Sequence, residues 1–209
     1  MKKVILISMI LVLGLATNGV AALILPLDYT FSSDSPAGTP PWLTATFTDV
    51  VPGTVTLTMD ATGLSGSEFL GEKGWYFNFN PGKNVTALGF VFVSGNNADG
   101  INVGVNGYKA DGDGFYDIQF FWDNSDRLVD GQTAVYTISG LTDLVAADFN
   151  YFSAPGGGAG VYLSAAHVQG TTGSEGSGWI GATVPEPSTI ILLVAGLAGV
   201  GILRRRFKK

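Results

Sequence analysis

Apolar residues alternate with hydroxyl-bearing residues along most of the chain between its two ends. The alternation is clearest in Leu27–Phe31, Trp42–Phe47 and Thr54–Met59. A period of two that is rich in Thr, Val and aromatic residues is typical of a β-strand with one buried face. The same reading predicts further strands at Trp75–Phe79, Val85–Val93, Ile101–Tyr108, Phe115–Trp122, Thr133–Ser139 and Gly160–Val168.

The segments between the predicted strands are rich in turn-forming residues. Val51-Pro52-Gly53 predicts a tight turn that joins its two flanking strands into a hairpin. Residues 61–74 have the composition of a loop, and residues 141–149 predict a short turn of helix. Many short strands with Gly-rich turns predict an all-β fold, an antiparallel two-sheet β-sandwich of jelly-roll-like form.

The N-terminus predicts a helical signal peptide over residues 1–22. Lys2 and Lys3 precede an apolar run, Val4–Leu15, and small residues end at Val20-Ala21-Ala22. This is the order of a secretory signal, and we expect signal peptidase to cleave after Ala22. The alternative is an uncleaved N-terminal anchor, and both interpretations place the domain outside the cytoplasm.

The C-terminal residues 184–209 have three parts in a fixed order. Pro185, Glu186 and Pro187 come first, and their prolines keep the backbone extended. An uncharged run, Ile190–Leu203, follows and predicts a transmembrane helix that is short against the roughly 17 to 25 residues of a usual span. The basic end contains Arg204, Arg205 and Arg206, which should stay on the cytoplasmic side.

This tripartite tail resembles the PEP-CTERM sorting signal of exported bacterial proteins. The resemblance covers the last 26 residues and implies processing by exosortase, a membrane-embedded cysteine enzyme. It implies a chain held transiently in the inner membrane and then delivered to the cell surface or extracellular matrix, in association with exopolysaccharide and biofilm. No LPxTG motif precedes the apolar run, so a sortase signal is a poor fit.

The predicted organisation is therefore a signal peptide (1–22), a β-sandwich domain (23–169), a Gly/Ser-rich linker (170–183) and the sorting signal (184–209). Seven of the 11 basic residues lie in the two terminal segments. The chain between them carries four basic and 16 acidic residues, a net charge of minus 12. Such a charge repels nucleic acid and leaves cations and neutral carbohydrate as the expected ligands. The chain has no cysteine, which excludes disulfides and thiol catalysis.

One acidic cluster suggests a cation site. Asp111, Asp113 and Asp117 lie in a D-x-D-G-x-x-D pattern, and alternating carboxylates with glycines between them let a loop surround calcium. The EF-hand pattern is incomplete, and a plain solvated turn is the alternative interpretation. Ca²⁺ is the one cofactor that the sequence suggests.

The remaining candidates weigh against catalysis. His167 is the only histidine, and no nucleophile motif accompanies it. An acid pair such as Glu68 and Asp117 could serve glycoside hydrolysis only at a set distance between the two carboxyl groups, and the sequence does not give this distance. Several aromatic residues would stack on sugars if they faced outward: Trp42, Trp75, Trp122, Trp179, Tyr76, Tyr108 and Tyr116. We expect a matrix protein that is not an enzyme. The alternatives are a calcium-dependent carbohydrate-binding module and a polysaccharide hydrolase.

Overall fold

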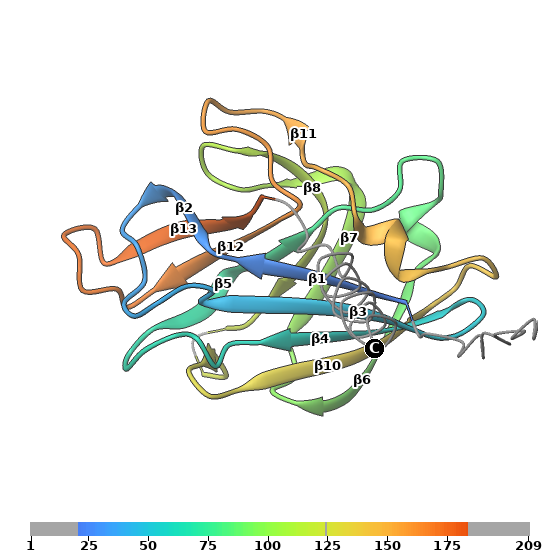
Figure 1. Cartoon of the computed structure of the whole chain (residues 1–209), viewed down its shortest axis with the longest axis horizontal. Helices are drawn as coiled ribbons and strands as arrows, with labels where there is room; N and C mark the ends of the chain where they lie inside the picture. The colour runs from blue at the N-terminus through green and yellow to red at the C-terminus, as the bar shows by residue number, and fades with distance from the viewer. Residues whose placement is uncertain (1–20, 124, 184–209) are drawn as a thin grey trace, which may run out of the picture.

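Two antiparallel sheets packed face to face form the body of the molecule, as Figure 1 shows. The computed structural model describes residues 21–123 and 125–183. The predicted all-β, two-sheet sandwich is confirmed. The five-stranded sheet has the order β1 (Ala22–Leu27), β3 (Leu43–Val51), β4 (Thr54–Asp60), β10 (Thr133–Ser139) and β6 (Gly89–Gly95).

The second sheet has eight strands. Its main path is β11 (Ala154–Pro155), β8 (Gly114–Phe121), β5 (Phe69–Phe77), β12 (Ser164–Gln169), β13 (Ser177–Ala182) and β2 (Tyr29–Ser33). β7 (Gly100–Lys109) pairs with β8, and β9 (Leu128–Val129) pairs with β5. Two short 3-10 helices, η1 (Val85–Ala87) and η2 (Ala146–Phe149), lie in the connections.

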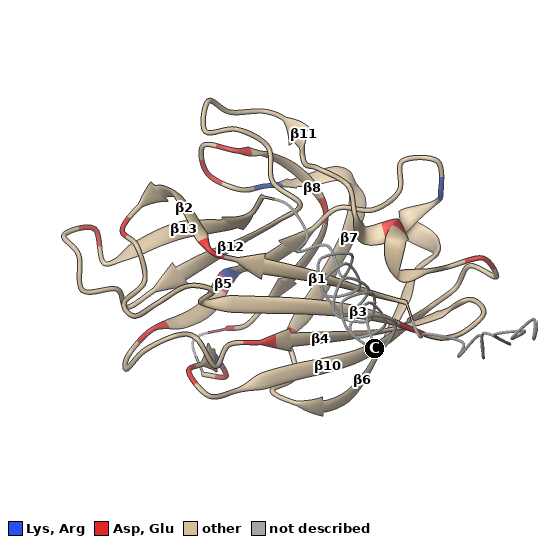
Figure 2. Ribbon diagram, in the orientation of Figure 1, with Lys and Arg blue, Asp and Glu red and all other residues tan. Residues whose placement is uncertain are grey.

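The alternating sequence pattern sets which face of each strand is buried. Every second side chain is buried over Leu43–Thr48 of β3 and throughout β4 and β10, and the residues between them are mostly threonines. The predicted hairpin is confirmed, because Phe47 pairs with Leu57 and Thr48 pairs with Thr56 across β3 and β4. Figure 2 shows that the acidic residues of the domain lie mainly on the loops.

Large aromatic side chains fill the space between the sheets. Phe47 stacks on Phe149 at a centroid distance of 4.1 Å and meets Phe77 edge to face. Trp75 is fully buried, and its indole Nε1 donates a hydrogen bond of 2.8 Å to Ser164 Oγ. Each such side chain contributes about 1.5 to 3 kcal/mol of apolar burial, so packing alone can stabilise a domain without disulfides.

Two predicted boundaries in the middle of the chain are wrong. The predicted loop 61–74 contains the first part of β5, from Phe69. The predicted strand 85–93 begins instead with η1, because Asn84 caps this turn by accepting a hydrogen bond of 3.1 Å from the Thr86 N–H. The predicted helical turn within 141–149 is confirmed as η2.

The predicted linker 170–183 is wrong over most of its second half. Ser177–Ala182 forms β13, which pairs with β12 on one side and β2 on the other. A Cβ at Gly178 would lie 1.8 Å from the carbonyl oxygen of Asp34, so the glycine permits close approach of two strands. The sandwich therefore extends to Ala182, past the predicted end at residue 169.

The predictions for the two ends lie largely outside the described residues. They are the signal peptide over residues 1–22, of which only Ala21 and Ala22 are described, and the sorting signal with its transmembrane helix over 184–209. β1 begins at Ala22, the predicted cleavage position, and Ala21 O accepts a hydrogen bond of 3.0 Å from the Asp49 N–H. Among residues 21–123 and 125–183, no helix is long and apolar enough to cross a membrane.

Candidate functional site

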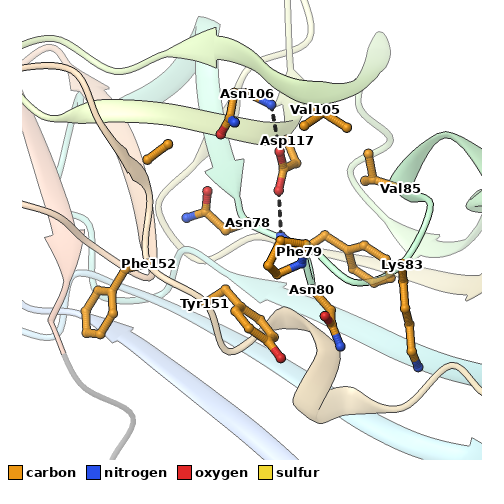
Figure 3. Close-up of a pocket in the computed structure, with 12 residues that line it drawn as sticks. Asn78, Phe79, Asn80, Lys83, Val85, Val105, Asn106, Asp117, Tyr151 and Phe152 are labelled. Carbon is orange, nitrogen blue, oxygen red and sulfur yellow. Dashed lines mark hydrogen bonds between the residues drawn. The ribbon is translucent and has the colours of Figure 1, made fainter.

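A pocket of about 270 Å³ opens where three segments meet at one end of the eight-stranded sheet. The segment after β5 provides residues 78–81, Lys83 and Val85. β7 and β8 provide Val105, Asn106 and Asp117, and the chain after η2 provides Tyr151, Phe152 and Ala154. Figure 3 shows Asn106 and Asp117 on one side of the pocket and Tyr151 and Phe152 on the other.

Asp117 holds two walls of the pocket together. Its Oδ2 accepts a hydrogen bond of 2.9 Å from the Phe79 N–H, and its Oδ1 accepts one of 2.8 Å from the Asn106 N–H (Figure 3). The side chain is 9% exposed. Both oxygens are thus engaged by backbone donors, and Asp117 positions the site as a structural clamp.

Asn106 has a backbone conformation that few residues adopt. Its φ is 50°, within a register shift of the β7–β8 pairing between Val103 and Tyr108. Asparagine tolerates this left-handed region better than most residues, and the hydrogen bond to Asp117 holds it there. A bulge of this kind changes the direction of a side chain, and here it places the Asn106 amide among the groups that line the pocket (Figure 3).

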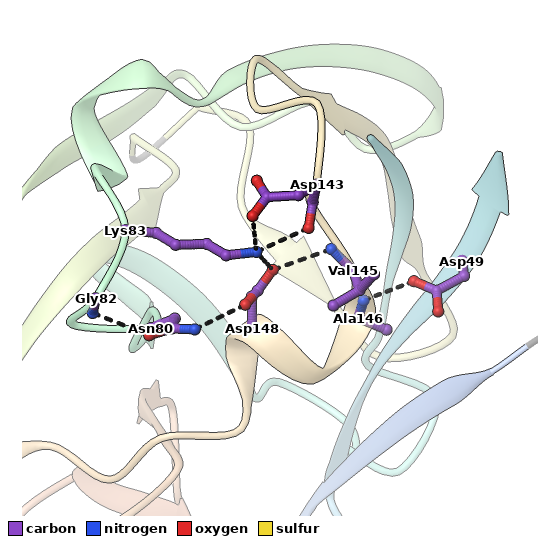
Figure 4. Close-up of polar contacts among 8 residues, drawn as sticks. All are labelled: Asp49, Asn80, Gly82, Lys83, Asp143, Val145, Ala146 and Asp148. Carbon is purple, nitrogen blue, oxygen red and sulfur yellow. Dashed lines mark hydrogen bonds and ion pairs between the residues drawn. The ribbon is translucent and has the colours of Figure 1, made fainter. Parts of the chain in front are cut away.

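An ion-pair network lies next to the pocket at Lys83, which is one of the lining residues (Figure 4). Lys83 Nζ lies 2.7 Å from Asp148 Oδ2 and 3.2 Å from Asp143 Oδ2. The hydrogen bond to Asp148 is the main cause of the raised pKa of Lys83. Burial of Asp148 acts to raise the pKa of its carboxyl, but the hydrogen bonds from Lys83, Asn80 and the Val145 N–H outweigh it and lower the pKa. The pocket therefore has a cation at its edge whose charge is already matched.

Aromatic rings and amides are among the groups that line the pocket. Phe152 is 52% exposed although it is a large apolar side chain, and Tyr151 next to it is half-buried. Asn78 donates its Nδ2 hydrogens to the Tyr162 and Leu163 carbonyls at 3.3 and 3.4 Å, which leaves its Oδ1 as the acceptor. Rings that stack and amides that accept or donate suit a neutral, hydroxyl-rich ligand.

The comparisons with known proteins identify the end of the chain. A family model described as the PEP-CTERM protein-sorting motif matches residues 183–206. The chain carries a PEP-CTERM sorting motif. This match contains Pro185, Glu186, Pro187 and Arg204–Arg206, the sorting signal predicted from the sequence, which lies outside the described residues. No curated protein and no solved structure matches the chain.

The motif supports a coarse assignment of location and processing. A PEP-CTERM protein is exported, is sorted through exosortase and is held transiently at the membrane on its way to the surface. The acidic β-sandwich is therefore the part that acts outside the cytoplasm.

The three carboxylates predicted to hold calcium have different partners. Asp113 is fully buried and accepts hydrogen bonds from the Tyr116 hydroxyl and from Ser153 Oγ, the latter at 2.8 Å. Burial raises the pKa of the Asp113 carboxyl despite these donors. Asp111 is exposed, and its Oδ2 lies 3.4 Å from the Ser32 hydroxyl.

These placements leave the calcium prediction without support from the geometry. Asp117 clamps backbone at the pocket, Asp113 ties two loops together inside the protein, and Asp111 faces solvent. In the described part of the chain, no group of three or more His, Cys, Asp or Glu side chains could hold a metal ion.

The acid pair considered for glycoside hydrolysis is not brought together either. Glu68 is 1% exposed, and its two oxygens accept the N–H groups of Ala37 and Ser65 at 2.6 and 2.9 Å. Glu68 precedes the first residue of β5, whereas Asp117 lies beside the pairing of Phe77 with Ile118 at the other end of this nine-residue strand. Phe69 pairs with Gln169 of β12 and Phe77 pairs with Ser164, so the two ends of β5 lie five strand steps apart. At the usual rise these steps span roughly 17 Å, beyond the separations that glycosidases use.

The aromatic residues named from the sequence are mostly core. All four tryptophans are at most 6% exposed, as are Tyr76 and Tyr116. The exposed aromatic at the pocket, Phe152, was missed because it follows Tyr151 directly and so belongs to no alternating pattern. The available signal was a pair of adjacent aromatic residues in a loop. Because no alternating pattern assigns either ring to the core, such a pair could have been predicted to be exposed.

His167 lies on β12 beside Trp179, with a ring-centroid distance of 4.9 Å. It is 6% exposed, and its Nδ1 has no hydrogen-bond partner among residues 21–123 and 125–183. Burial, and then the charge of Lys73, lowers the pKa of His167 from 6.5 to about 4. The imidazole is therefore neutral at pH 7, and no nucleophile accompanies it.

This histidine gives a prediction about acid stability. The unfolded chain takes up the His167 proton near pH 6.5 and the folded chain only near pH 4, so the stability it contributes is full above pH 6.5 and is lost between these values. Between pH 7 and pH 4 we expect the wild type to lose about 3 kcal/mol more unfolding free energy than His167→Gln. Urea titrations of both variants at the two pH values measure the difference. An equal loss in both would contradict a buried neutral imidazole.

Proposed function

We propose that this exported PEP-CTERM protein is a non-catalytic component of an exopolysaccharide matrix or biofilm, and that its pocket holds a neutral sugar unit. The observation that carries the proposal is that an exposed aromatic residue, Phe152, lines a cavity of about 270 Å³ together with Tyr151 and the amides of Asn78, Asn80 and Asn106. Sugars present an apolar face and a rim of hydroxyl groups, and this pocket offers a partner for each.

Charge supports a neutral ligand over an acidic one. The domain between the terminal segments has a net charge of minus 12, and the lysine at the pocket, Lys83, is paired with Asp143 and Asp148. An anionic sugar would meet no unpaired cation among the residues described as lining the pocket. Neutral hexose or N-acetylhexosamine units are the class that fits.

The engagement of the acidic side chains supports a role without catalysis. Hydrolysis of a glycosidic bond needs a carboxyl group free to transfer a proton and a second one at a set distance. Asp117, the carboxylate that lines the pocket, has both oxygens hydrogen-bonded to backbone N–H groups. The pocket is therefore built to hold a ligand in place.

The test is binding of the exported protein to a neutral glycan array, followed by calorimetry on the glycan that binds. We expect Phe152→Ala to weaken binding about two- to tenfold, because one stacking face contributes roughly 0.5 to 1.5 kcal/mol. Tyr29→Ala is the matched control, since Tyr29 is 51% exposed against 52% for Phe152 but does not line the pocket.

Three outcomes would contradict the proposal. Binding that Phe152→Ala and Tyr29→Ala reduce equally would place the ligand elsewhere. Absence of binding across the array would remove the sugar-binding role. Release of reducing ends from a bound polysaccharide by the wild type would establish catalysis in place of simple binding.

A further inference from the structure

The two sheets of the sandwich differ in how their open edges are protected. An edge strand presents unpaired N–H and C=O groups, and proteins usually protect it with charges, prolines, short length or bulges. β1, at one edge of the five-stranded sheet, contains Pro26 and is followed by Asp28. In the eight-stranded sheet, β2 is flanked by Asp28 and Asp34. The other edge strand, β7, pairs only with β8, has a register shift between Val103 and Tyr108, and ends at Lys109.

β6 lacks most of these protections. It ends the five-stranded sheet and pairs only with β10. Its sequence, Gly-Phe-Val-Phe-Val-Ser-Gly, has no charge and no proline. Figure 2 shows no charged residue along it. Val91, Phe92 and Val93 are 62, 39 and 56% exposed, which is high for adjacent apolar residues. A bulge at Val93, where Ser94 pairs with Val135 and Phe92 with Tyr136, leaves Gly89–Phe92 as a regular ladder.

We propose that β6 is a self-association site, at which β6 of a second copy of this chain pairs antiparallel about a two-fold axis. The five-stranded sheets of the two copies would then form one continuous sheet across the interface. A two-fold arrangement satisfies both open edges at once, because each copy supplies the same surface. It also places Val91 of each copy next to Val91 of the other on the outer face.

Charge is the reason for choosing a second copy as the occupant. The domain carries a net charge of minus 12, so two copies repel one another through most of their surface. Between Lys83 and Lys109 the only charged residue is Asp99, and β6 lies within this nearly neutral stretch. Two copies can therefore approach here with the least repulsion. The near-palindromic order of β6 residues keeps apolar side chains opposite apolar ones when the strand pairs with itself antiparallel.

The absence of cysteine makes the test direct. The full-length Val91→Cys variant is expressed in cells that export it. The cells are then treated with diamide, a mild oxidant, so that neighbouring cysteines at the cell surface form disulfides. Strand pairing brings opposite Cα atoms to about 4.5 to 5.5 Å, within reach of a disulfide. Val50→Cys is the matched control, because Val50 is 57% exposed but lies near the tip of the β3–β4 hairpin. We expect at least about tenfold more cross-linked dimer from Val91→Cys.

A charge variant tests the same contact without a cross-link. Val91→Lys puts two cations side by side at the axis and should weaken dimerisation, measured by sedimentation of the exported protein, roughly tenfold. Val50→Lys adds the same charge elsewhere and should leave dimerisation unchanged. Equal cross-linking of Val91→Cys and Val50→Cys, or a dimer that survives Val91→Lys, would overturn the proposal. So would a Val91→Cys adduct whose mass is that of another protein.

Discussion

Gly74→Ala is expected to lower the free energy of unfolding by about 4 kcal/mol or to prevent folding altogether. Gly74 has a φ of 60°, which disfavours a side chain, and an added Cβ would lie 1.8 Å from the carbonyl oxygen of Phe120. That oxygen belongs to β8, the strand that pairs with β5, so the clash can be relieved only by separating two strands of the sheet. The loss should appear in urea unfolding monitored by tryptophan fluorescence.

Gly66→Ala is the matched control for this prediction. Gly66 has a φ of 63°, yet nothing lies within 4 Å of the position its Cβ would take. Gly66→Ala should therefore lower the free energy of unfolding only by the cost of a side chain in the left-handed backbone conformation, about 1 kcal/mol. Equal losses at the two positions would show that backbone conformation, and not the close approach of β5 and β8, decides the cost.

Asp117→Ala is expected to lower the free energy of unfolding by about 3 kcal/mol and to abolish ligand binding by the pocket. The substitution removes both acceptors of the Phe79 and Asn106 N–H groups, and the Phe79 donor is buried. Because Asn106 adopts its left-handed conformation with this support, the pocket rim should lose its shape. Denaturant unfolding measures the first effect, and calorimetry with the bound glycan measures the second.

The other acidic residues of the predicted calcium loop distinguish a clamp from a metal site. Asp111→Ala should change stability by less than about 0.5 kcal/mol, since Asp111 is exposed and its nearest polar contact is 3.4 Å away. A shared calcium ion would instead make Asp111→Ala and Asp117→Ala lose stability together and would make EGTA lower the thermal midpoint of the wild type. That pattern would contradict the assignment of Asp117 as a backbone clamp.

The two proposals have a joint consequence for a matrix protein. A dimer paired through β6 carries two pockets, so its binding to a repetitive polysaccharide gains from effective concentration. Such a dimer should therefore hold a polymer more tightly than it holds a single sugar unit. In Val91→Lys the affinity for the polymer should fall to that for a single sugar unit, while the affinity for the single unit is retained. This result would show that pairing through β6 strengthens polymer binding by the pocket.

The sequence alone determined the class of fold and the sorting motif at the C-terminal end. Alternation of Thr with apolar residues in 42–47 and 54–59 reports which face of a strand is buried, and the antiparallel hairpin between them follows from a local turn. The tripartite tail was readable for the same reason, because its three parts are consecutive in the chain, and the family model matches it.

Tertiary structure decided what depends on partners distant in sequence. Residues 177–182 have the composition of a linker, but β12 and β2 make them a strand, with Gly178 against the backbone of Asp34. Asp111, Asp113 and Asp117 are close in sequence, yet Asp111 is exposed to solvent, Asp113 is hydrogen-bonded inside the protein and Asp117 is bound to backbone N–H groups at the pocket. The pocket joins segments from 78 to 154, and no local pattern encodes which loops the two sheets bring together.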